Sequence, residues 1–166
     1  MDFFWGDERC VPPDDPASNY RMARETLLDP LSIPGSRIHR WRSELAPEEA
    51  ATLYEAELGA IAGAPPILDL VFLGLGEDGH TASLFPGSAA LGVQDRSCAA
   101  NFAPSLGAWR LTLTFPVLDA AREVLFLVEG EGKREIVRKI EAGGDYPAAH
   151  VRAAKTLWYL DRAATG

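Results

Sequence analysis

A histidine and a carboxylate stand close together in a glycine-rich segment of the sequence. Gly79 separates Asp78 from His80, and Gly76 lies just before them. A histidine beside a carboxylate is able to act as a general base near neutral pH, with the carboxylate orienting the imidazole or stabilising the imidazolium. The two glycines would let backbone N–H groups approach an anion or a developing oxyanion. The segment predicts general-base chemistry, with a histidine that only bonds its own loop as the alternative.

Four further charged side chains stand where an anionic substrate would meet them. Asp7 and Arg9 directly follow a short apolar run, and a guanidinium suits bidentate contact with a phosphate or carboxylate. Arg110 begins an alternating run, and Lys133 stands at a predicted helix start, where backbone N–H groups favour an anion. The alternative for each is an exposed charge or a local ion pair.

Other chemistries fit the sequence less well. Residues 74–79 match the dinucleotide fingerprint G-x-G-x-x-G, but Pro86 breaks the chain about two turns later, where that fingerprint needs a long helix. Ser83 is a conceivable nucleophile, although its neighbours do not form a G-x-S-x-G turn. Cys10 and Cys98 have no evident base, disulfide framework or zinc motif around them. We therefore expect no cofactor and no metal.

Short apolar runs alternate with helical segments, which indicates an α/β fold with a mainly parallel sheet. The run from Ile67 to Leu73 is apolar on both faces, as a buried parallel strand is. Ligands of such sheets bind beyond the carboxyl ends of the strands, and several of the candidate residues follow predicted strands. The strands are predicted at residues 3–5, 38–41, 67–73, 109–115, 124–128 and 156–160.

The helices are predicted from caps, prolines and apolar spacing. Ser18 is placed to cap a helix that carries Tyr20, Ala23 and Leu27 on one face. Pro47 suits the first turn of a second helix. Two more are predicted, a short one at Pro116 and one after Gly132, while residues 88–105 lack a periodicity that would assign them. No linker divides the chain, so residues 1–166 are expected to form one domain.

Composition and charge exclude several classes of protein. The 166 residues are 47% hydrophobic and 24% charged, which is typical of a globular domain. The formal net charge is −8, and no basic segment is present that would bind nucleic acid or an anionic membrane. No apolar run is long enough for a membrane span, and the N-terminus lacks the features of a signal peptide. We expect a cytoplasmic protein.

Four segments, taken in order, resemble the 6-phosphogluconolactonase family. Residues 4–9 read FWGDER and residues 73–86 read LGLGEDGHTASLFP. Residues 110–114 read RLTLT and residues 130–133 read GEGK. The second segment is the most specific of these motifs, and the resemblance extends over nearly the whole chain.

The resemblance implies a fold, a reaction and a set of roles. The fold is a Rossmann-like sheet flanked by helices, and the reaction is hydrolysis of 6-phosphogluconolactone to 6-phosphogluconate in the oxidative pentose phosphate pathway, without an obligate cofactor. His80 would be the base that activates water, and Asp7 and Asp78 would shape and polarise the site. The remaining candidates would bind the sugar-phosphate lactone, with the cation that meets its phosphate left open: Arg9, Arg110, Lys133, Gly76 and Gly79.

One departure from the family pattern leaves other readings open. Members of the family begin with a further segment that includes a strand and a phosphate-binding loop, and the sequence resembles them only from that point onward. We expect an exposed sheet edge that self-association could cover. A catalytically impaired homologue that only binds a sugar phosphate is one alternative. A sugar-phosphate isomerase or deaminase is another, disfavoured because Arg9 stands where the deaminase pattern has a tyrosine.

Overall fold

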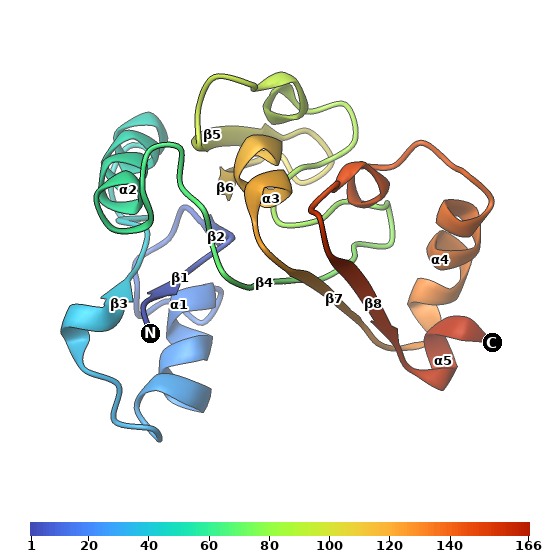
Figure 1. The fold of residues 1–166 in the computed structure, drawn as a ribbon, viewed down its shortest axis with the longest axis horizontal. Coiled ribbons are helices and arrows are strands. Elements are labelled where there is room, and N and C mark those ends of the chain that lie inside the picture. The colour runs from blue at the N-terminus through green and yellow to red at the C-terminus, as the bar shows by residue number, and fades with distance from the viewer.

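Parallel strands form two of the three small sheets in the computed structural model, which describes residues 1–166 (Figure 1). One sheet pairs β1 with β3, and the other has the order β4-β7-β8. This arrangement confirms the predicted α/β class and the parallel pairing. The parallel strands are β1 (Phe3–Phe4), β3 (Ile38–His39), β4 (Val71–Leu73), β7 (Val124–Val128) and β8 (Thr156–Leu160).

The third sheet is antiparallel and was not predicted. It has the order β2-β6-β5, with β2 at Asp7–Arg9, β6 at Ala108–Leu113 and β5 at Cys98–Ala103. Two of the predicted functional segments therefore lie side by side, because β2 pairs directly with residues 110–112 of β6. The segment 88–105, which had no periodicity, contains β5 and a 3-10 turn.

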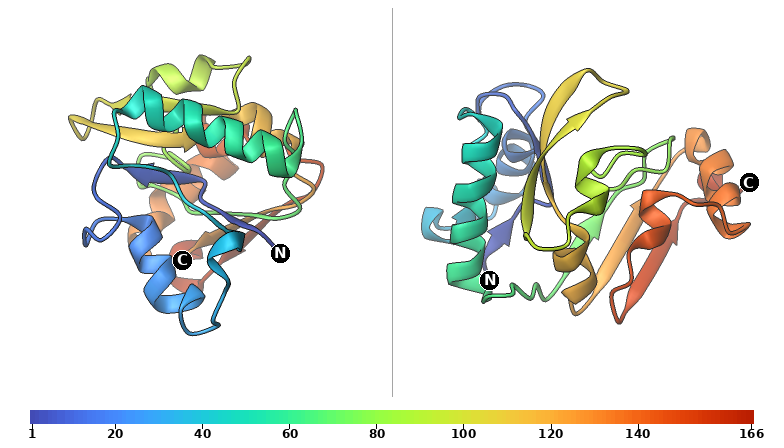
Figure 2. Two further views of the ribbon diagram at one scale, coloured as in Figure 1. Left: turned by 90° about the vertical axis from the view of Figure 1, so that its left-hand side faces the viewer. Right: turned by 90° about the horizontal axis from the view of Figure 1, so that it is seen from above.

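Helices cover the sheets from several sides. Figures 1 and 2 show the β1–β3 pair between α1 and α2, with α3 beside the antiparallel sheet and α4 and α5 at the C-terminal end. None of these helices combines the length and the apolar character that a bilayer crossing requires. The helices are α1 (Asn19–Ala23), α2 (Pro47–Ala62), α3 (Phe115–Ala120), α4 (Arg134–Glu141) and α5 (Arg162–Thr165).

Aromatic side chains fix the end of β1 against α2. Trp41 stacks on Tyr54 with ring centroids 3.7 Å apart, and both side chains are buried. The Tyr54 hydroxyl accepts from the backbone N–H of Trp5 at 2.7 Å, and the Trp41 indole donates to the Trp5 carbonyl at 3.0 Å. Because Trp5 lies just before β2, this cluster sets where the first functional strand begins.

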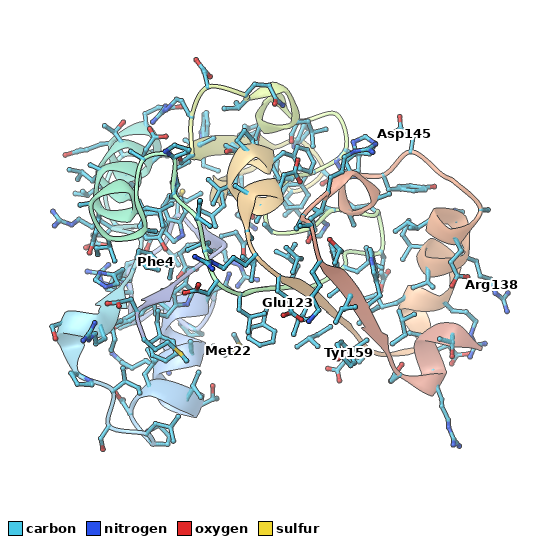
Figure 3. All side chains as sticks on the ribbon, in the orientation of Figure 1. Phe4, Met22, Glu123, Arg138, Asp145 and Tyr159 are labelled. Carbon is cyan, nitrogen blue, oxygen red and sulfur yellow. The ribbon has the colours of Figure 1, made fainter.

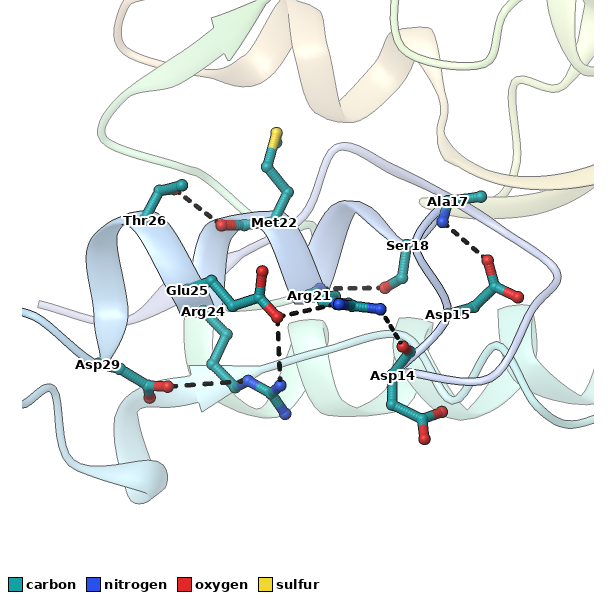
Figure 4. Close-up of polar contacts among 10 residues, drawn as sticks. All are labelled: Asp14, Asp15, Ala17, Ser18, Arg21, Met22, Arg24, Glu25, Thr26 and Asp29. Atoms are coloured by element: carbon teal, nitrogen blue, oxygen red, sulfur yellow. Dashed lines mark hydrogen bonds and ion pairs between the residues drawn. The ribbon is translucent and has the colours of Figure 1, made fainter.

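The helix predicted at Ser18 forms, but its buried face is shifted. The Ser18 hydroxyl caps α1 by accepting from the N–H of Arg21 at 3.1 Å (Figure 4). A π-helical turn follows over Arg24–Leu28 and winds more widely than an α-helix. Leu28 is consequently buried at 1% exposure, while Leu27 is 43% exposed. The prediction of Leu27 on the buried face was wrong for this reason.

Four predicted strands are shorter than expected, and those at 3–5 and 38–41 end at Phe4 and His39. Only Val71–Leu73 of the predicted strand 67–73 is paired, because its partner β7 begins at Val124 and the residues before it belong to α3 and a turn. The predicted strand 109–115 ends at Leu113, because Thr114 is the N-cap of α3 and Phe115 is its first residue. The alternation of apolar and polar residues there did not predict which side chains are buried, because Thr112 is fully buried and Trp109 is 44% exposed.

Candidate active site

The loop after β4 is closed by hydrogen bonds between its own residues. The N–H of Gly76 donates to the His80 carbonyl at 2.8 Å, and the N–H of Gly79 donates to the Gly76 carbonyl at 3.0 Å. The Thr81 hydroxyl donates to the Gly74 carbonyl at 2.9 Å. These N–H groups are therefore already used within the loop, and the chemistry there rests on the side chains that the loop carries.

His80 and Asp78 form a close pair at the surface of this loop. Nδ1 of the His80 ring lies 2.5 Å from Oδ1 of Asp78, and the backbone N–H of His80 donates to the same oxygen at 3.1 Å. The Nε2 atom makes no hydrogen bond, and the side chain is 30% exposed. The ring also rests against Phe85, with centroids 4.4 Å apart. With a proton on Nδ1, Nε2 presents a free lone pair to the solvent side.

The Asp78 carboxyl is held in its ionised form. Partial burial raises the pKa of this group, but hydrogen bonds from the His80 ring and backbone outweigh it, so the pKa lies below the ordinary value. An ionised Asp78 fixes the proton on Nδ1 of His80 and stabilises the imidazolium when Nε2 takes a second proton.

The two glycines of the loop make room for neighbouring side chains. A Cβ at Gly76 would lie 2.0 Å from Nδ1 of His80, and a Cβ at Gly79 would lie 2.5 Å from Cδ1 of Tyr146. Gly79 also has a φ of 83°, in the region that favours glycine. Any larger residue at Gly76 would displace the His80 ring from its position beside Asp78.

Asp7 meets this loop from the antiparallel sheet. Its Oδ2 accepts from the Ser83 hydroxyl at 2.6 Å, and its Oδ1 accepts from the Asn19 amide at 3.2 Å. Burial raises the pKa of the Asp7 carboxyl, against the lowering effects of the Ser83 hydrogen bond and the charges of Arg9 and His80. The structure thus brings the predicted residues Asp7 and His80 into one electrostatic neighbourhood.

Two buried polar residues, which the sequence did not indicate, hold the loop through hydrogen bonds to Ser83. The Asn101 amide donates to the Ser83 carbonyl at 2.8 Å and to the Ser88 hydroxyl at 2.9 Å. The Thr112 hydroxyl accepts from the N–H of Ser83 at 3.2 Å. Asn101 is 1% exposed and Thr112 is fully buried. Asn101 lies in the stretch without periodicity, so only its polarity amid small apolar residues could have marked it.

Two arginines of the antiparallel sheet are direct neighbours in register, and the carboxylate of Asp7 interacts with the charge of Arg9 without forming an ion pair. Arg9 and Arg110 are direct partners in the β2–β6 register, so their side chains leave the same face of the sheet. Arg9 donates to the carbonyl of Ala17, Arg110 donates to its neighbour Trp109, and neither makes an ion pair with a carboxylate. Like charges placed directly opposite repel each other, and an anion bound between them would relieve this repulsion.

The side chains of Glu8 and Lys133 are not part of the group around His80. The carboxylate of Glu8 is 1% exposed and accepts from the N–H groups of Asn19 and Tyr20 at 2.8 Å, so it supports the start of α1 instead of the site. Lys133 ends a 3-10 turn just before α4. Its loop passes the loop after β4, since a Cβ at Gly132 would lie 2.8 Å from Glu77 Oε1. No hydrogen bond or ion pair joins Lys133 to the other predicted residues.

The structure offers no group of three His, Cys, Asp or Glu side chains that could hold a metal ion. Both cysteines are free, and burial is the main cause that raises the pKa of each thiol. A raised pKa keeps a thiol protonated and therefore unreactive. The arrangement that remains is a histidine with a free Nε2, the half-buried carboxylate of Asp7 and two neighbouring arginines that form no ion pair.

Comparison with known proteins shows which family the chain is similar to. Residues 1–158 match the model of a family described as glucosamine-6-phosphate isomerases/6-phosphogluconolactonase. The 6-phosphogluconolactonase of Haemophilus influenzae is 38% identical over 99% of this chain and 72% of its own length, and that of Synechocystis is 44% identical over 97% and 70%. The crystal structure of 6-phosphogluconolactonase from Thermotoga maritima is similar, with a TM-score of 0.86 and 35% identity over 96% of this chain and 72% of that one. The chain belongs to the glucosamine-6-phosphate isomerase/6-phosphogluconolactonase family.

Proposed function

We propose that this protein hydrolyses 6-phosphogluconolactone to 6-phosphogluconate in the oxidative pentose phosphate pathway. The observation that carries the proposal is the His80–Asp78 pair at 2.5 Å, which leaves Nε2 free, together with the half-buried carboxylate of Asp7, whose pKa the charge of His80 lowers. The names of the matched relatives support the choice of substrate. The unpaired arginines of β2 and β6 support an anionic group on that substrate.

In the proposed reaction, Nε2 of His80 removes a proton from water as the water oxygen bonds to the lactone carbonyl carbon. Asp78 stabilises the imidazolium that forms. The tetrahedral intermediate then collapses, the ring C–O bond breaks, and the imidazolium returns its proton to the departing ring oxygen. Asp7 is proposed to fix the electrostatics of the site, because its charge favours the imidazolium of His80.

The phosphate of the substrate is assigned to the arginine pair. Arg9 and Arg110 leave one face of the sheet, and two guanidinium groups match the geometry of a phosphate dianion. Lys133, on the loop that passes the catalytic loop, is then assigned to the hydroxyl groups of the sugar. Gly76 and Gly79 serve the substrate site indirectly, through the space they leave for His80 and Tyr146.

The test compares hydrolysis of fresh 6-phosphogluconolactone by the protein, by two variants and by buffer alone, because the lactone also opens spontaneously. His80→Ala is expected to lose nearly all of the acceleration, since general-base catalysis contributes roughly 10²- to 10⁴-fold. The matched control is His150→Ala, because His150 also lies 2.5 Å from a carboxylate, that of Asp145, and is exposed.

Three results would contradict the proposal. Equal rates in the protein and in buffer would mean that the folded chain does not turn the lactone over. Equal losses in both histidine variants would remove the special role of His80. Release of ammonia from glucosamine 6-phosphate would instead support a deaminase, the other activity that the family description includes.

We further propose that two copies of this chain associate through one face of the β4-β7-β8 sheet, in place of the sheet edge expected from the sequence, and that the protein works in the cytoplasm. The surface, here called the bare sheet face, consists of Leu70, Phe72, Leu127 and Tyr159, which are 45–59% exposed, together with Met22 of α1 at 59%. Figure 3 shows Met22 and Tyr159 on the same side of the molecule. Parallel sheets are normally covered on both faces, and a cytoplasmic setting suits two free cysteines.

The size of the bare sheet face supports a second copy as its partner. At roughly 100 Å² exposed per large side chain, it offers about 500 Å², near the upper end for the largest apolar patch of a monomer. Two such faces would bury about 1,000 Å², which is close to the least that a specific interface requires. The apolar groove of about 580 Å³ between β1 and β4 continues this surface.

A further inference from the structure

Ser83 is the point at which the catalytic loop is attached to the antiparallel sheet. Its hydroxyl donates to Asp7 of β2 at 2.6 Å, and its N–H donates to the hydroxyl of Thr112 of β6 at 3.2 Å. Its carbonyl accepts from the amide of Asn101 of β5 at 2.8 Å. Every polar group of Ser83 therefore has a partner, each from a different strand of one sheet, and the residue is 1% exposed.

We propose that Ser83 is a positioning residue for the reaction: its hydroxyl holds the Asp7 carboxylate ionised and in a fixed place relative to His80. The inference rests on the proposed function, because Asp7 and His80 are assigned to the lactonase reaction there. It adds a residue that acts through Asp7 and does not touch the substrate.

The environment of Asp7 explains why this one hydrogen bond matters. Charged groups face the carboxylate from two directions, Arg9 and Glu8 on its own strand and His80 on the loop. Only two side chains donate hydrogen bonds to it, Ser83 at 2.6 Å and Asn19 at 3.2 Å. A half-buried carboxylate that loses its shorter hydrogen bond becomes harder to ionise.

The backbone conformation between His80 and Ser83 gives independent support for this role of Ser83. Ala82 lies between His80 and Ser83 with a φ of 47°, a conformation that residues other than glycine seldom adopt. Such a residue persists only where its surroundings hold it. The contacts of Ser83 on one side, and the bonds of His80 and Thr81 to the loop on the other, hold Ala82 in place.

Burial also separates this role from nucleophilic catalysis. A serine hydroxyl that donates to a carboxylate could in principle be activated to attack a carbonyl. At 1% exposure, however, the Ser83 hydroxyl is not accessible to a substrate. The geometry therefore fits a group that orients Asp7 and not one that reacts.

The test is the titration of the Asp7 carboxyl carbon, followed by ¹³C NMR in the 166-residue protein and assigned with the Asp7→Asn variant. Ser83→Ala removes the donor and is expected to raise the pKa of Asp7 by about one unit or more. The matched control is Ser88→Ala. It removes a different buried hydroxyl, which accepts from the Asn101 amide and has no contact with Asp7. It is expected to leave the Asp7 titration unchanged.

The same variants carry an activity readout. If Asp7 must be ionised, the acid limb of the lactonase pH profile should move to higher pH in Ser83→Ala, and kcat should fall roughly 10- to 100-fold. Ser88→Ala should keep the wild-type limb even if its thermal stability falls. If Ser83→Ala does not fold, Ser83→Cys replaces it, because a thiol fills similar space with a weaker donor, and its titration should shift in the same direction.

The outcomes separate this inference from the proposed function. An Asp7 titration that does not move in Ser83→Ala or Ser83→Cys overturns the positioning role, whatever the activity. An unchanged acid limb in an active variant also overturns it. A titration that moves in a protein without lactonase activity supports the Ser83–Asp7 contact and shows that the assigned reaction is the part that failed.

Discussion

Two carboxylates of the site experience opposite environments. Hydrogen bonds from His80 hold the pKa of Asp78 below its ordinary value, whereas burial raises that of Asp7. Environments that separate the pKa values of neighbouring groups are typical of sites that move protons. On this basis we propose that Asp78 serves His80 as a permanent counter-charge and that the ionisation of Asp7 limits activity on the acid side.

We expect Asp7→Asn to lose activity without losing stability. A raised pKa means that the ionised carboxyl is disfavoured in the folded protein, and this penalty is present at pH values above the pKa of the folded state. As the pH falls through that pKa, the wild-type protein should gain stability relative to the variant. Thermal unfolding at neutral and at acid pH, with activity measured in parallel, checks both statements. A variant that is inactive because it melts earlier at neutral pH would contradict them.

Gly76→Ala should inactivate the protein, whereas Gly74→Ala should not. A Cβ at Gly76 would lie 2.0 Å from the His80 ring, but a Cβ at Gly74 would meet nothing within 4 Å. Displacing the base by about 1 Å is expected to reduce kcat/KM roughly 100-fold. The comparison is a steady-state assay of both variants after a check of their circular dichroism. Similar kinetics for the two alanines would show that the position of His80 is not set by this space.

At the scale of elements, strands β2 and β6 bring two positive charges together by register alone. Arg9 and Arg110 would each be read as an ordinary surface arginine if taken singly. Their antiparallel pairing places them on one face, where neither forms an ion pair with a carboxylate. The pair is thus a property of the sheet and could not be derived from either strand.

Arg110→Met should weaken substrate binding and slightly stabilise the free protein. Loss of a charged bidentate contact is expected to raise KM roughly 10- to 100-fold, while relief of the repulsion from Arg9 contributes a few tenths of a kcal/mol. Arg122→Met is the control, because Arg122 is 72% exposed and paired with Asp69. Kinetics, and protection by inorganic phosphate in thermal unfolding, measure the two effects. An unchanged KM would mean that another cation binds the phosphate, and Lys133 would be the first candidate.

The elements that could be predicted are those whose signals are local. Pro47 marks the start of α2, and the apolar run 124–128 is β7 with the predicted bounds. The failures depend on distant partners or on irregular winding, as with β4, which has a neighbour only from Val71 onward. Leu28 replaced Leu27 in the core because of a π-helical turn. Periodicity carries no information about either cause.

The residues proposed for the reaction could be predicted from the sequence, but the residues that hold them in place could not. His80, Asp78 and Asp7 were identified from residue type and from family motifs, and the structure places them near one another. Asn101 and Thr112 were not, because a buried hydrogen bond depends on which strands pair, and β5 was not predicted. The remaining candidate, Lys133, approaches through its loop without a contact to the others.

At the scale of the whole molecule, the bare sheet face leads to a prediction about assembly. The unmodified protein is expected to run as a dimer in size-exclusion chromatography with light scattering. Leu127→Lys should give monomers, because a charge would be buried at the centre of the interface. Trp109→Lys is the control, since Trp109 is 44% exposed on β6, outside the bare sheet face. A monodisperse monomer at the highest soluble concentration would contradict the assembly.

The contact between Ser83 and Asp7 joins residues 76 positions apart in the chain. Closing so long a loop has an entropic cost that short-range contacts do not carry, so such a contact forms after the local helices and turns. The carboxylate and the base therefore come together only when the antiparallel sheet has assembled around them. During refolding, catalytic activity should return later than the circular dichroism of the helices. The reaction that the site performs is in this sense a kinetic marker for the final stage of folding.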